Sequence, residues 1–392
     1  MTFAVGLNAL HLVPGETGGS ELYARRLIEA LAMSDPALRL KVFAARLAVP
    51  SLQEEDWPDN VELVGLPFDA RSRPRRVLAE QTILRREIRR AGVELLHNLF
   101  TTAPVVPGVP QVTTIHDLIY KRYPETHAGF LGHGLAALTW VAARRSDRVI
   151  AVSEAAKTDI VRFLTVPATR VDVTYEGPAL RASEAVSEAT LRSALELGEG
   201  PIVLTVSAKR PHKNLERLVE AFLNASTDGR PMLVVPGYPT FYEPALRARA
   251  EALDGSGRIR FTGWLEDDLL DGLYRAASFF IFPSLAEGFG LPVLDALVRG
   301  TPTACSNASA LPEVAGDAVL YFDPMDVGEM TRAIERLLVD AALRERLRRA
   351  GPQRALTFTW ERTAHATLES YKRTMQGSRK RPRKYPLRRW AE

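Results

Sequence analysis

The sequence contains almost no cysteine: Cys305 is the only one among 392 residues. A single thiol cannot form an internal disulfide, so small disulfide-stabilised folds are excluded and a reducing compartment is favoured. A basic stretch followed by an apolar one, which marks a secretory signal peptide, is also missing, because the first basic residue is Arg25. We therefore expect a cytoplasmic protein.

Long apolar runs and two familiar site motifs are missing as well. The best apolar candidate, 135–143, is too short to span a membrane and is followed directly by two arginines, so it predicts a buried helix. The pattern G-x-G-x-x-G does not follow the first predicted strand, which argues against a nicotinamide dehydrogenase. The histidines lack a metal-ligand spacing such as H-E-x-x-H, and we expect no metal site.

Charge is unevenly distributed. The net charge is +4, but the tail 377–392 carries seven basic residues and one acid, so the rest of the chain is slightly acidic. The body has no nucleic-acid footprint, and no nucleic-acid partner is expected. The composition of the tail predicts disorder. The tail is either a solvated terminus or a peripheral contact with anionic lipid at the inner face of the membrane.

Strand-like runs alternate with helical patterns along a chain long enough for two domains. Runs that are apolar on both faces, such as "FAVGLNAL" and "FFIFPS", indicate strands covered by helices on each side of a parallel sheet. We predict an α/β protein with two Rossmann-like parallel-sheet domains that face each other across a cleft. The predicted ranges are a first domain 1–181, a second domain 182–358, a helix 359–376 that returns to the first domain, and the tail 377–392.

The loops after the strands are the expected sites, because ligands of open parallel sheets bind beyond the carboxyl ends of the strands. One loop, "EGFGLPVLD" (287–295), follows the strand "FFIFPS". Gly288 and Gly290 let a ligand approach the backbone, and Pro292 predicts the first turn of a helix whose free N–H groups attract anions. Glu287 and Asp295 flank this loop and indicate a ligand that also offers hydroxyl donors, although an ordinary acidic first turn would explain Asp295 alone.

Another loop, "SAKRPHKN" (207–214), also lies between a strand and a helix. Lys209, Arg210 and Lys213 form a predicted cationic cluster, which could bind phosphate without a metal, and Asn214 is placed to cap the helix. A solvated basic loop is the alternative. In the first domain, Gly18 and Gly19 precede the first helix.

His116 follows a predicted strand end and is expected to point into the same cleft, although a lone histidine is as often structural.

Together these stretches resemble the retaining nucleotide-sugar glycosyltransferases of family four, which have the GT-B fold. The specific part is "EGFGLPVLDALVRGTP" followed by "LPEVAGDAVLYFDP". Weaker blocks occur in the family's order: "HDLIY", "VSEAAKTDI", "HKNLERLVEAF" and "GWLEDDLL". The likeness covers 1–376 and leaves out the basic tail.

The resemblance implies a donor site in the second domain. It places Glu287 at the hydroxyls of the donor sugar, Lys213 at the diphosphate and Asp295 at the ribose. Backbone groups of the glycine loop, through Gly288, Phe289, Gly290 and Leu291, would reach the sugar and the diphosphate. The backbone at Leu265 would read the base.

In the first domain the resemblance places His116 near the reacting centre and Gly18 and Gly19 near the diphosphate. Two positions depart from the family pattern. Asp295 replaces a usual glutamate, and Ala208 replaces a frequent arginine whose charge Lys209 or Arg210 could supply.

The implied reaction is metal-independent transfer of a hexose from a UDP- or GDP-linked sugar to a hydroxyl, with retention at the anomeric carbon. The acceptor would be a glycan or a lipid-linked glycan in cell-surface polysaccharide or glycolipid assembly. The donor is a substrate, and no cofactor is expected. The alternatives are a sugar-nucleotide epimerase of the same fold and a non-catalytic sugar-nucleotide binding protein.

Overall fold

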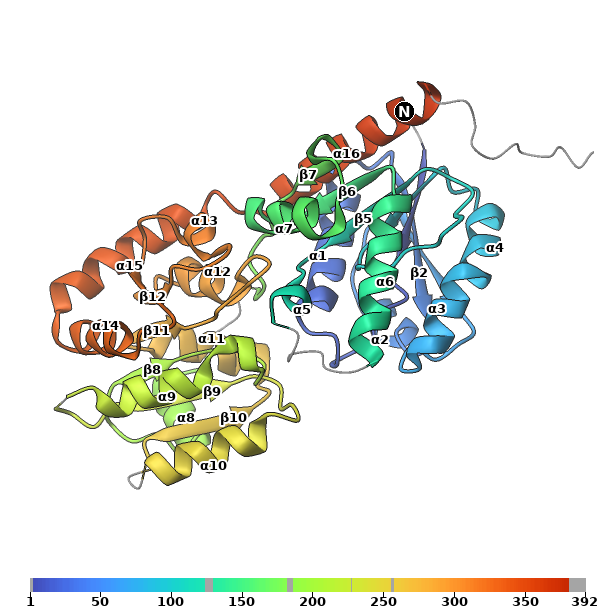
Figure 1. The fold of residues 1–392 in the computed structure, drawn as a ribbon. Coiled ribbons are helices and arrows are strands. Elements are labelled where there is room, and N and C mark those ends of the chain that lie inside the picture. The colour runs from blue at the N-terminus through green and yellow to red at the C-terminus, as the bar shows by residue number, and fades with distance from the viewer. Residues whose placement is uncertain (1–2, 124–129, 182–185, 227, 255–256, 381–392) are drawn as a thin grey trace, which may run out of the picture. The chain divides into compact units, whose positions relative to one another are not determined.

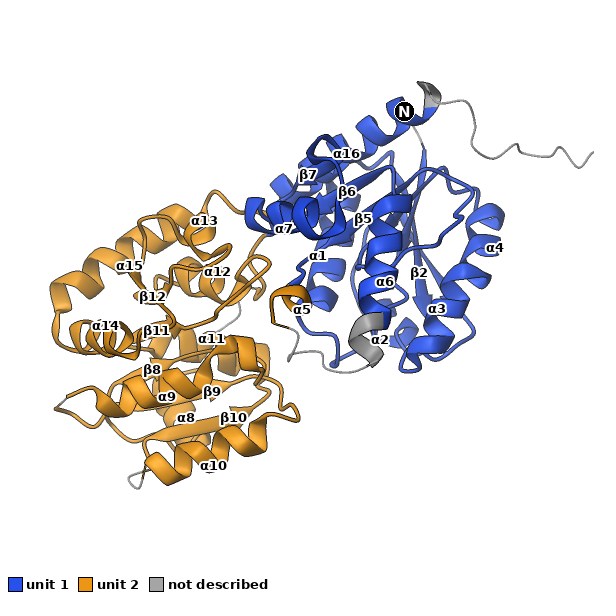
Figure 2. Ribbon diagram, in the orientation of Figure 1, with its two compact units in different colours: residues 1–118, 128–176, 360–392 blue, residues 119–127, 177–359 orange. Residues whose placement is uncertain are grey.

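The protein is described here from a computed structural model, which covers residues 3–123, 130–181, 186–226, 228–254 and 257–380 (Figure 1). The chain forms two compact units, coloured separately in Figure 2. Unit 1 comprises 1–118, 128–176 and 360–392, and unit 2 comprises 119–127 and 177–359. Both units are built from parallel strands connected by helices, as the alternation of patterns predicts.

Unit 1 contains a seven-stranded parallel sheet with the order β3-β2-β1-β4-β5-β6-β7. Its strands are β1 (Ala4–Asn8), β2 (Arg39–Ala45), β3 (Val61–Leu66), β4 (Leu95–Asn98), β5 (Gln111–Ile115), β6 (Arg148–Ala151) and β7 (Val171–Val173). Its helices are α1 (Gly19–Ser34), α2 (Val49–Gln53), α3 (Arg73–Gln81), α4 (Ile83–Arg90), α6 (Phe130–Arg145), α7 (Glu154–Leu164) and α16 (Trp360–Lys380). The strand order reverses between β1 and β4, so the loops that follow these two strands flank the expected binding crevice of the unit.

Unit 2 contains a six-stranded parallel sheet with the order β10-β9-β8-β11-β12-β13. Its strands are β8 (Ile202–Leu204), β9 (Met232–Pro236), β10 (Ile259–Gly263), β11 (Phe279–Phe282), β12 (Thr303–Ser306) and β13 (Leu320–Phe322). Its helices include α5 (Ile119–Arg122), α8 (Glu188–Ala194), α9 (Leu215–Asn224), α10 (Glu243–Leu253), α11 (Asp267–Ala276), α12 (Leu291–Val298), α13 (Leu311–Ala315), α14 (Val327–Val339) and α15 (Ala341–Ala355). Here the order reverses between β8 and β11.

Helix α9, which follows β8, buries one apolar face. Leu215, Leu218, Val219 and Phe222 of α9 are all buried and pack with Val203 and Phe279 in the core of unit 2. Their i, i+3, i+4, i+7 spacing turns one face of the helix to the sheet.

The last helix, α16, packs back on unit 1, as predicted. It lies against α1, β5 and β6. The Tyr371 hydroxyl lies 2.7 Å from His97 Nδ1, and Ser370 Oγ donates to Asp172 at 2.8 Å. Both contacts are buried, so this C-terminal helix completes the core of the first unit.

Helix α8 lies within the segment 178–201. Helices α3 and α4 are divided at Thr82. Helix α16 continues to Lys380, four residues into the predicted tail, and 381–392 lie outside the described residues. No helix in the described parts of the chain has the length and apolarity needed to cross a membrane.

Candidate active site

The candidate donor site lies in unit 2, where β8 and β11 pair side by side. Val203 and Leu204 align with Phe279 and Phe280 in a parallel register. The loops that follow these strands therefore leave the same edge of the sheet as neighbours. These are the basic loop 205–214 and the glycine loop 283–290.

The glycine loop has the geometry that its sequence predicts. Gly290 has φ +117°, and an added Cβ there would lie 2.7 Å from Leu311 Cδ2, so a side chain is excluded on two grounds. Helix α12 begins at Leu291 with Pro292 in its first turn. Phe289 is buried edge-to-face against Phe358, with ring centroids 5.6 Å apart. The ring anchors the loop while its backbone turns at Gly290.

Lys213 and Glu287 meet at this switch point. Lys213 Nζ lies 2.6 Å from Glu287 Oε1, and Ser284 Oγ donates to the same oxygen at 2.5 Å. Lys213 Nζ also lies 5.4 Å from the centre of the Phe282 ring. The family resemblance implies that Lys213 contacts the diphosphate and that Glu287 contacts the sugar. In the structure the two charged groups contact each other. Ser284 is a member of this site that the sequence reasoning missed, although it directly follows "FFIFP".

Asn214 fastens the basic loop to the glycine loop, and of its predicted role as a helix cap only the position is confirmed. It occupies the cap position of α9 in a left-handed conformation, but its side chain makes no capping hydrogen bond. Instead Nδ2 donates to the carbonyl oxygens of Pro283 and Pro324, at 3.1 and 2.7 Å. The residue after Lys213 is therefore held against the loop that carries Glu287.

The predicted cationic cluster is wrong for Lys209. This side chain is fully buried, and its Nζ donates to the carbonyl oxygen of Gly237 at 2.6 Å. Burial lowers the pKa of Lys209 to about 8. Lys209 thus joins the loop after β8 to the loop after β9. Arg210 is half-buried.

The segment expected to read the base lies at the end of β10. Leu265 is buried, and Trp264 beside it is 51% exposed. The Trp264 ring stacks on Tyr238, with centroids 4.2 Å apart. The Gly237 N–H donates to the Gly263 carbonyl at 2.8 Å and ties these two loops together. The exposed Trp264 ring offers a flat face to a planar ligand.

Asp295 is buried and makes contacts that the sequence did not predict. Its Oδ1 accepts hydrogen bonds from the N–H groups of Ala179 and Leu180, at 2.9 and 3.1 Å, and Arg299 lies 3.8 Å away. Burial raises the pKa of Asp295 to about 6, against the opposing charge of Arg299. The carboxylate holds the segment through which the chain enters unit 2. A ribose contact stays a prediction.

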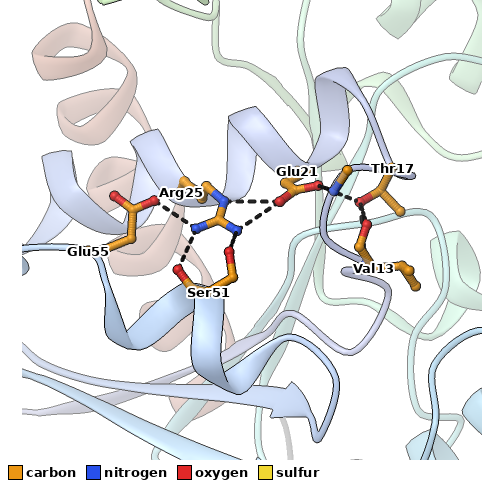
Figure 3. Close-up of polar contacts among 7 residues, drawn as sticks. Val13, Thr17, Glu21, Arg25, Ser51 and Glu55 are labelled. Atoms are coloured by element: carbon orange, nitrogen blue, oxygen red, sulfur yellow. Dashed lines mark hydrogen bonds and ion pairs between the residues drawn. The ribbon is translucent and has the colours of Figure 1, made fainter. Parts of the chain in front are cut away.

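Unit 1 carries the other predicted site residues. Gly18 has φ +56° and precedes Gly19, the first residue of α1. Figure 3 shows how the preceding loop is held. Glu21 Oε2 accepts hydrogen bonds from the Gly15 N–H at 3.1 Å and from Thr17 Oγ1 at 3.2 Å. Arg25 then connects Glu21 to Glu55, at 2.8 and 2.7 Å, so the glycine loop is tied to the body of the unit.

His116 lies just beyond the end of β5 and has a partner that the sequence reasoning missed. Its Nδ1 lies 3.2 Å from Glu176 Oε1, and its Nε2 lies 3.1 Å from the Leu99 carbonyl oxygen. Tyr23 packs edge-on against the ring at 4.6 Å. Burial alone would lower the pKa of His116, but the bond and charge of Glu176 raise it above its usual value. Glu176 gives no motif in the sequence beyond its place after the last strand of the unit.

A buried polar network joins β1, β4 and α3 at the same end of the sheet. Asn8 Nδ2 donates to Glu80 Oε1 at 2.8 Å and lies 2.9 Å from Asn98 Oδ1. Thr102 Oγ1 donates to the same Glu80 oxygen at 3.1 Å. Burial raises the pKa of Glu80 to about 7, although these hydrogen bonds act in the opposite direction.

The described residues contain no cluster of three histidine, cysteine or acidic side chains suited to a metal ion. The two parallel α/β units, each with its loops at a strand-order reversal, define the class of two-unit proteins with the GT-B fold.

Comparison with known proteins identifies the family. Residues 17–178 match the model "Glycosyltransferase Family 4", and residues 187–354 match "Glycosyl transferases group 1". The chain is 32% identical over 266 residues to O-antigen chain mannosyltransferase B of Escherichia coli, covering 67% of this chain and 70% of that protein. The chain therefore belongs to the family 4 glycosyltransferases.

Two further comparisons show how far the likeness extends. The chain is 32% identical over 290 residues to the serotype-specific mannosyltransferase WbdA of Escherichia coli, covering 68% of this chain but only 34% of that larger protein. Among solved structures, HepE of Anabaena, crystallised with UDP and glucose, matches with a TM-score of 0.73 and 19% identity. The match covers 95% of this chain and 100% of that one, and it supports the fold alone.

Removing the Asp295 carboxylate should destabilise unit 2. Asp295→Ala removes a carboxylate that accepts from two part-buried N–H groups, which should cost about 2 kcal/mol of unfolding free energy. Asp295→Asn keeps an oxygen at the same place and should recover most of the loss. Urea unfolding measures both. Calorimetry with UDP and GDP tests the ribose contact separately, and loss of nucleotide affinity at unchanged stability would contradict the role proposed here.

Glu80 should make unit 1 less stable as the pH rises. Its pKa of about 7 in the folded chain exceeds the ordinary 4.5, so the folded state binds more protons between these values. Wild type should lose about 3 kcal/mol from this group between pH 5 and pH 8, at about 1.4 kcal/mol per pKa unit. Glu80→Gln keeps an oxygen acceptor and should not show this loss. Equal slopes of unfolding free energy against pH in the two proteins would contradict the assignment.

Proposed function

We propose that this chain transfers a hexose from a nucleoside diphosphate sugar to a hydroxyl of a glycan or lipid-linked glycan, with retention and without a metal ion. The contact between Lys213 and Glu287 carries the proposal. Opposite charges side by side next to a glycine loop match a ligand with an anionic part and a hydroxyl-rich part. A nucleoside diphosphate sugar has both.

Lys213 and Glu287 would bind different parts of the donor, because their charges are opposite. Lys213 can exchange Glu287 for a phosphate oxygen, which also accepts a charge-assisted hydrogen bond from an ammonium group. Charge develops on the diphosphate as the glycosidic bond breaks, and Lys213 with the N–H groups at the start of α12 would stabilise it. Glu287 would then accept hydrogen bonds from sugar hydroxyls. In this arrangement the positive charge at the leaving group is supplied by the protein itself.

Retention is supported by the family likeness and by the limited supply of carboxylates. In the donor half, Asp295 binds backbone N–H groups and Glu287 binds Lys213. Neither is placed as a separate nucleophile for double displacement, which requires a second carboxylate at the anomeric carbon. We therefore infer attack by the acceptor on the face that the diphosphate leaves. The departing phosphate would take the proton of the acceptor hydroxyl.

The names of the relatives suggest the substrates to test first. O-antigen chain mannosyltransferase B and WbdA point to a mannosyl donor and a polysaccharide acceptor, and HepE was crystallised with UDP and glucose. Trp264 and Tyr238 form a stacked pair near Leu265 and would bind the base. We therefore propose a role in the assembly of O-antigen or a related polysaccharide.

A donor screen in excess EDTA tests the proposal. Thermal shift with UDP, GDP and their glucose and mannose conjugates identifies the donor, because ligand at 100 times its dissociation constant stabilises by about 2.7 kcal/mol. Turnover with a mannoside acceptor should keep its full rate in EDTA. NMR of the product should show the same anomeric configuration as in the donor. Loss of turnover with EDTA and rescue by Mg²⁺ or Mn²⁺ would contradict it, as would epimerisation of the donor alone.

Substituting the ion pair should separate sugar binding from phosphate binding. Glu287→Ala should weaken binding of the sugar nucleotide and leave nucleoside diphosphate affinity unchanged or improved, because a negative charge and a competitor for Lys213 are removed. Lys213→Ala should reduce kcat by about 10² to 10³, the effect of about 2.7–4 kcal/mol at the leaving group. Calorimetry and initial rates measure these effects. Equal weakening of both ligands by Glu287→Ala would leave the carboxylate with only a structural role.

A further inference from the structure

His116 has a hydrogen-bond acceptor at each of its ring nitrogens. Its Nδ1 lies 3.2 Å from Glu176 Oε1, and its Nε2 lies 3.1 Å from the Leu99 carbonyl oxygen. A carbonyl oxygen can only accept, so Nε2 carries a hydrogen. An ionised carboxylate can also only accept, so Nδ1 carries a hydrogen as well. A histidine that donates from both nitrogens is an imidazolium, and these contacts therefore favour the charged ring.

The titratable groups around this ring are compatible with a positive charge on it. Burial opposes the charged form, and Asp117, the next residue in the chain, favours it. Burial lowers the pKa of His11 and of His97 to about 3, so both are uncharged at neutral pH. The Tyr23 ring packs edge-on at 4.6 Å, and burial raises the pKa of its hydroxyl, which stays neutral. The neighbouring acids and the backbone acceptor together outweigh burial.

Glu176 is held in place by the C-terminal helix. It follows the end of β7 and is buried. Thr363 Oγ1 of α16 donates to the carbonyl oxygen of Tyr175, the preceding residue, at 2.7 Å. The ring of Trp360, the first residue of α16, lies 5.9 Å from the Tyr23 ring between centroids. Helix α16 thus fixes the backbone beside the acid and packs on the aromatic ring that contacts the histidine.

His116 borders the expected crevice of unit 1, because it lies against the loop after β4 and its side chain is 15% exposed. We propose that Glu176 is a positioning residue that keeps His116 as a doubly protonated cation, so that His116 donates hydrogen bonds in glycosyl transfer instead of acting as a general base. A ring with a hydrogen on each nitrogen has no lone pair left to take a proton from an acceptor hydroxyl. The inference rests on the proposed function and adds a pH requirement to it, because turnover should fall as rising pH removes this proton.

The first test is a pH titration of the full chain, with isotope-labelled histidine, by NMR and without any ligand. The signal that disappears in His116→Asn assigns the ring. His116 should titrate above its ordinary pKa of 6.5 in the wild type. Glu176→Gln keeps the size of the side chain and removes its charge, so the proton affinity of His116 should fall by about tenfold or more, which is one pKa unit. Glu176→Asp keeps the charge on a shorter side chain and should recover part of this affinity.

The second test is the dependence of kcat on pH, measured with the donor that the thermal-shift screen identifies. In Glu176→Gln the alkaline fall of kcat should move to lower pH by the same factor as the NMR titration. A purely structural role for Glu176 would leave this profile in place. Glu361→Gln is the matched control and should change neither measurement, because Glu361 lies 3.9 Å from His365 on the exposed surface of α16.

Three results would overturn the proposal. They are a wild-type His116 that titrates at or below its ordinary pKa, a titration that Glu176→Gln leaves unchanged, and a shifted titration with an unmoved profile of kcat. Failure of every sugar nucleotide to bind or turn over contradicts the proposed function instead. The NMR titration needs no substrate, so it still decides whether Glu176 keeps His116 charged.

Discussion

The parallel pairing of β8 with β11 is the constraint on which the candidate donor site depends. These strands are separated by more than seventy residues in the chain, yet their register brings the ends of both to one edge of the sheet. Only for this reason does the ammonium group of Lys213 reach the carboxylate of Glu287. Asn214 then holds the basic loop to the glycine loop through the carbonyl of Pro283, and to the loop after β13 through the carbonyl of Pro324. The charged pair is thus a consequence of sheet topology.

Local sequence patterns could predict the elements and the glycine loop, because their causes are local. The apolar runs define buried strands, the stripe of α9 defines its buried face, and Gly290 is required where φ is positive. The partners of the site residues could not be predicted in the same way. Glu176 is 60 residues from His116, and Asp295 is 116 residues from the Ala179 N–H that it binds. Such contacts depend on packing between distant elements, and no spacing rule encodes them.

Lys209 and Lys213 illustrate this limit. They lie four residues apart in one basic loop and look equivalent in the sequence. Lys209 points inward to the Gly237 carbonyl and loses part of its affinity for protons by burial. Lys213 instead meets a carboxylate at a partly accessible position. The difference follows from which neighbouring loop each side chain meets, the loop after β9 for Lys209 and the loop after β11 for Lys213.

Helix α12 links the glycine loop to the segment 179–180. Its first residues follow the glycine loop, and one turn later Asp295 accepts two hydrogen bonds from 179–180, just after the chain enters unit 2. A glutamate at this position would be longer by one methylene and could not hold the same backbone groups in the same geometry. Asp295, the shorter acid, therefore fits the role of holding the backbone of 179–180.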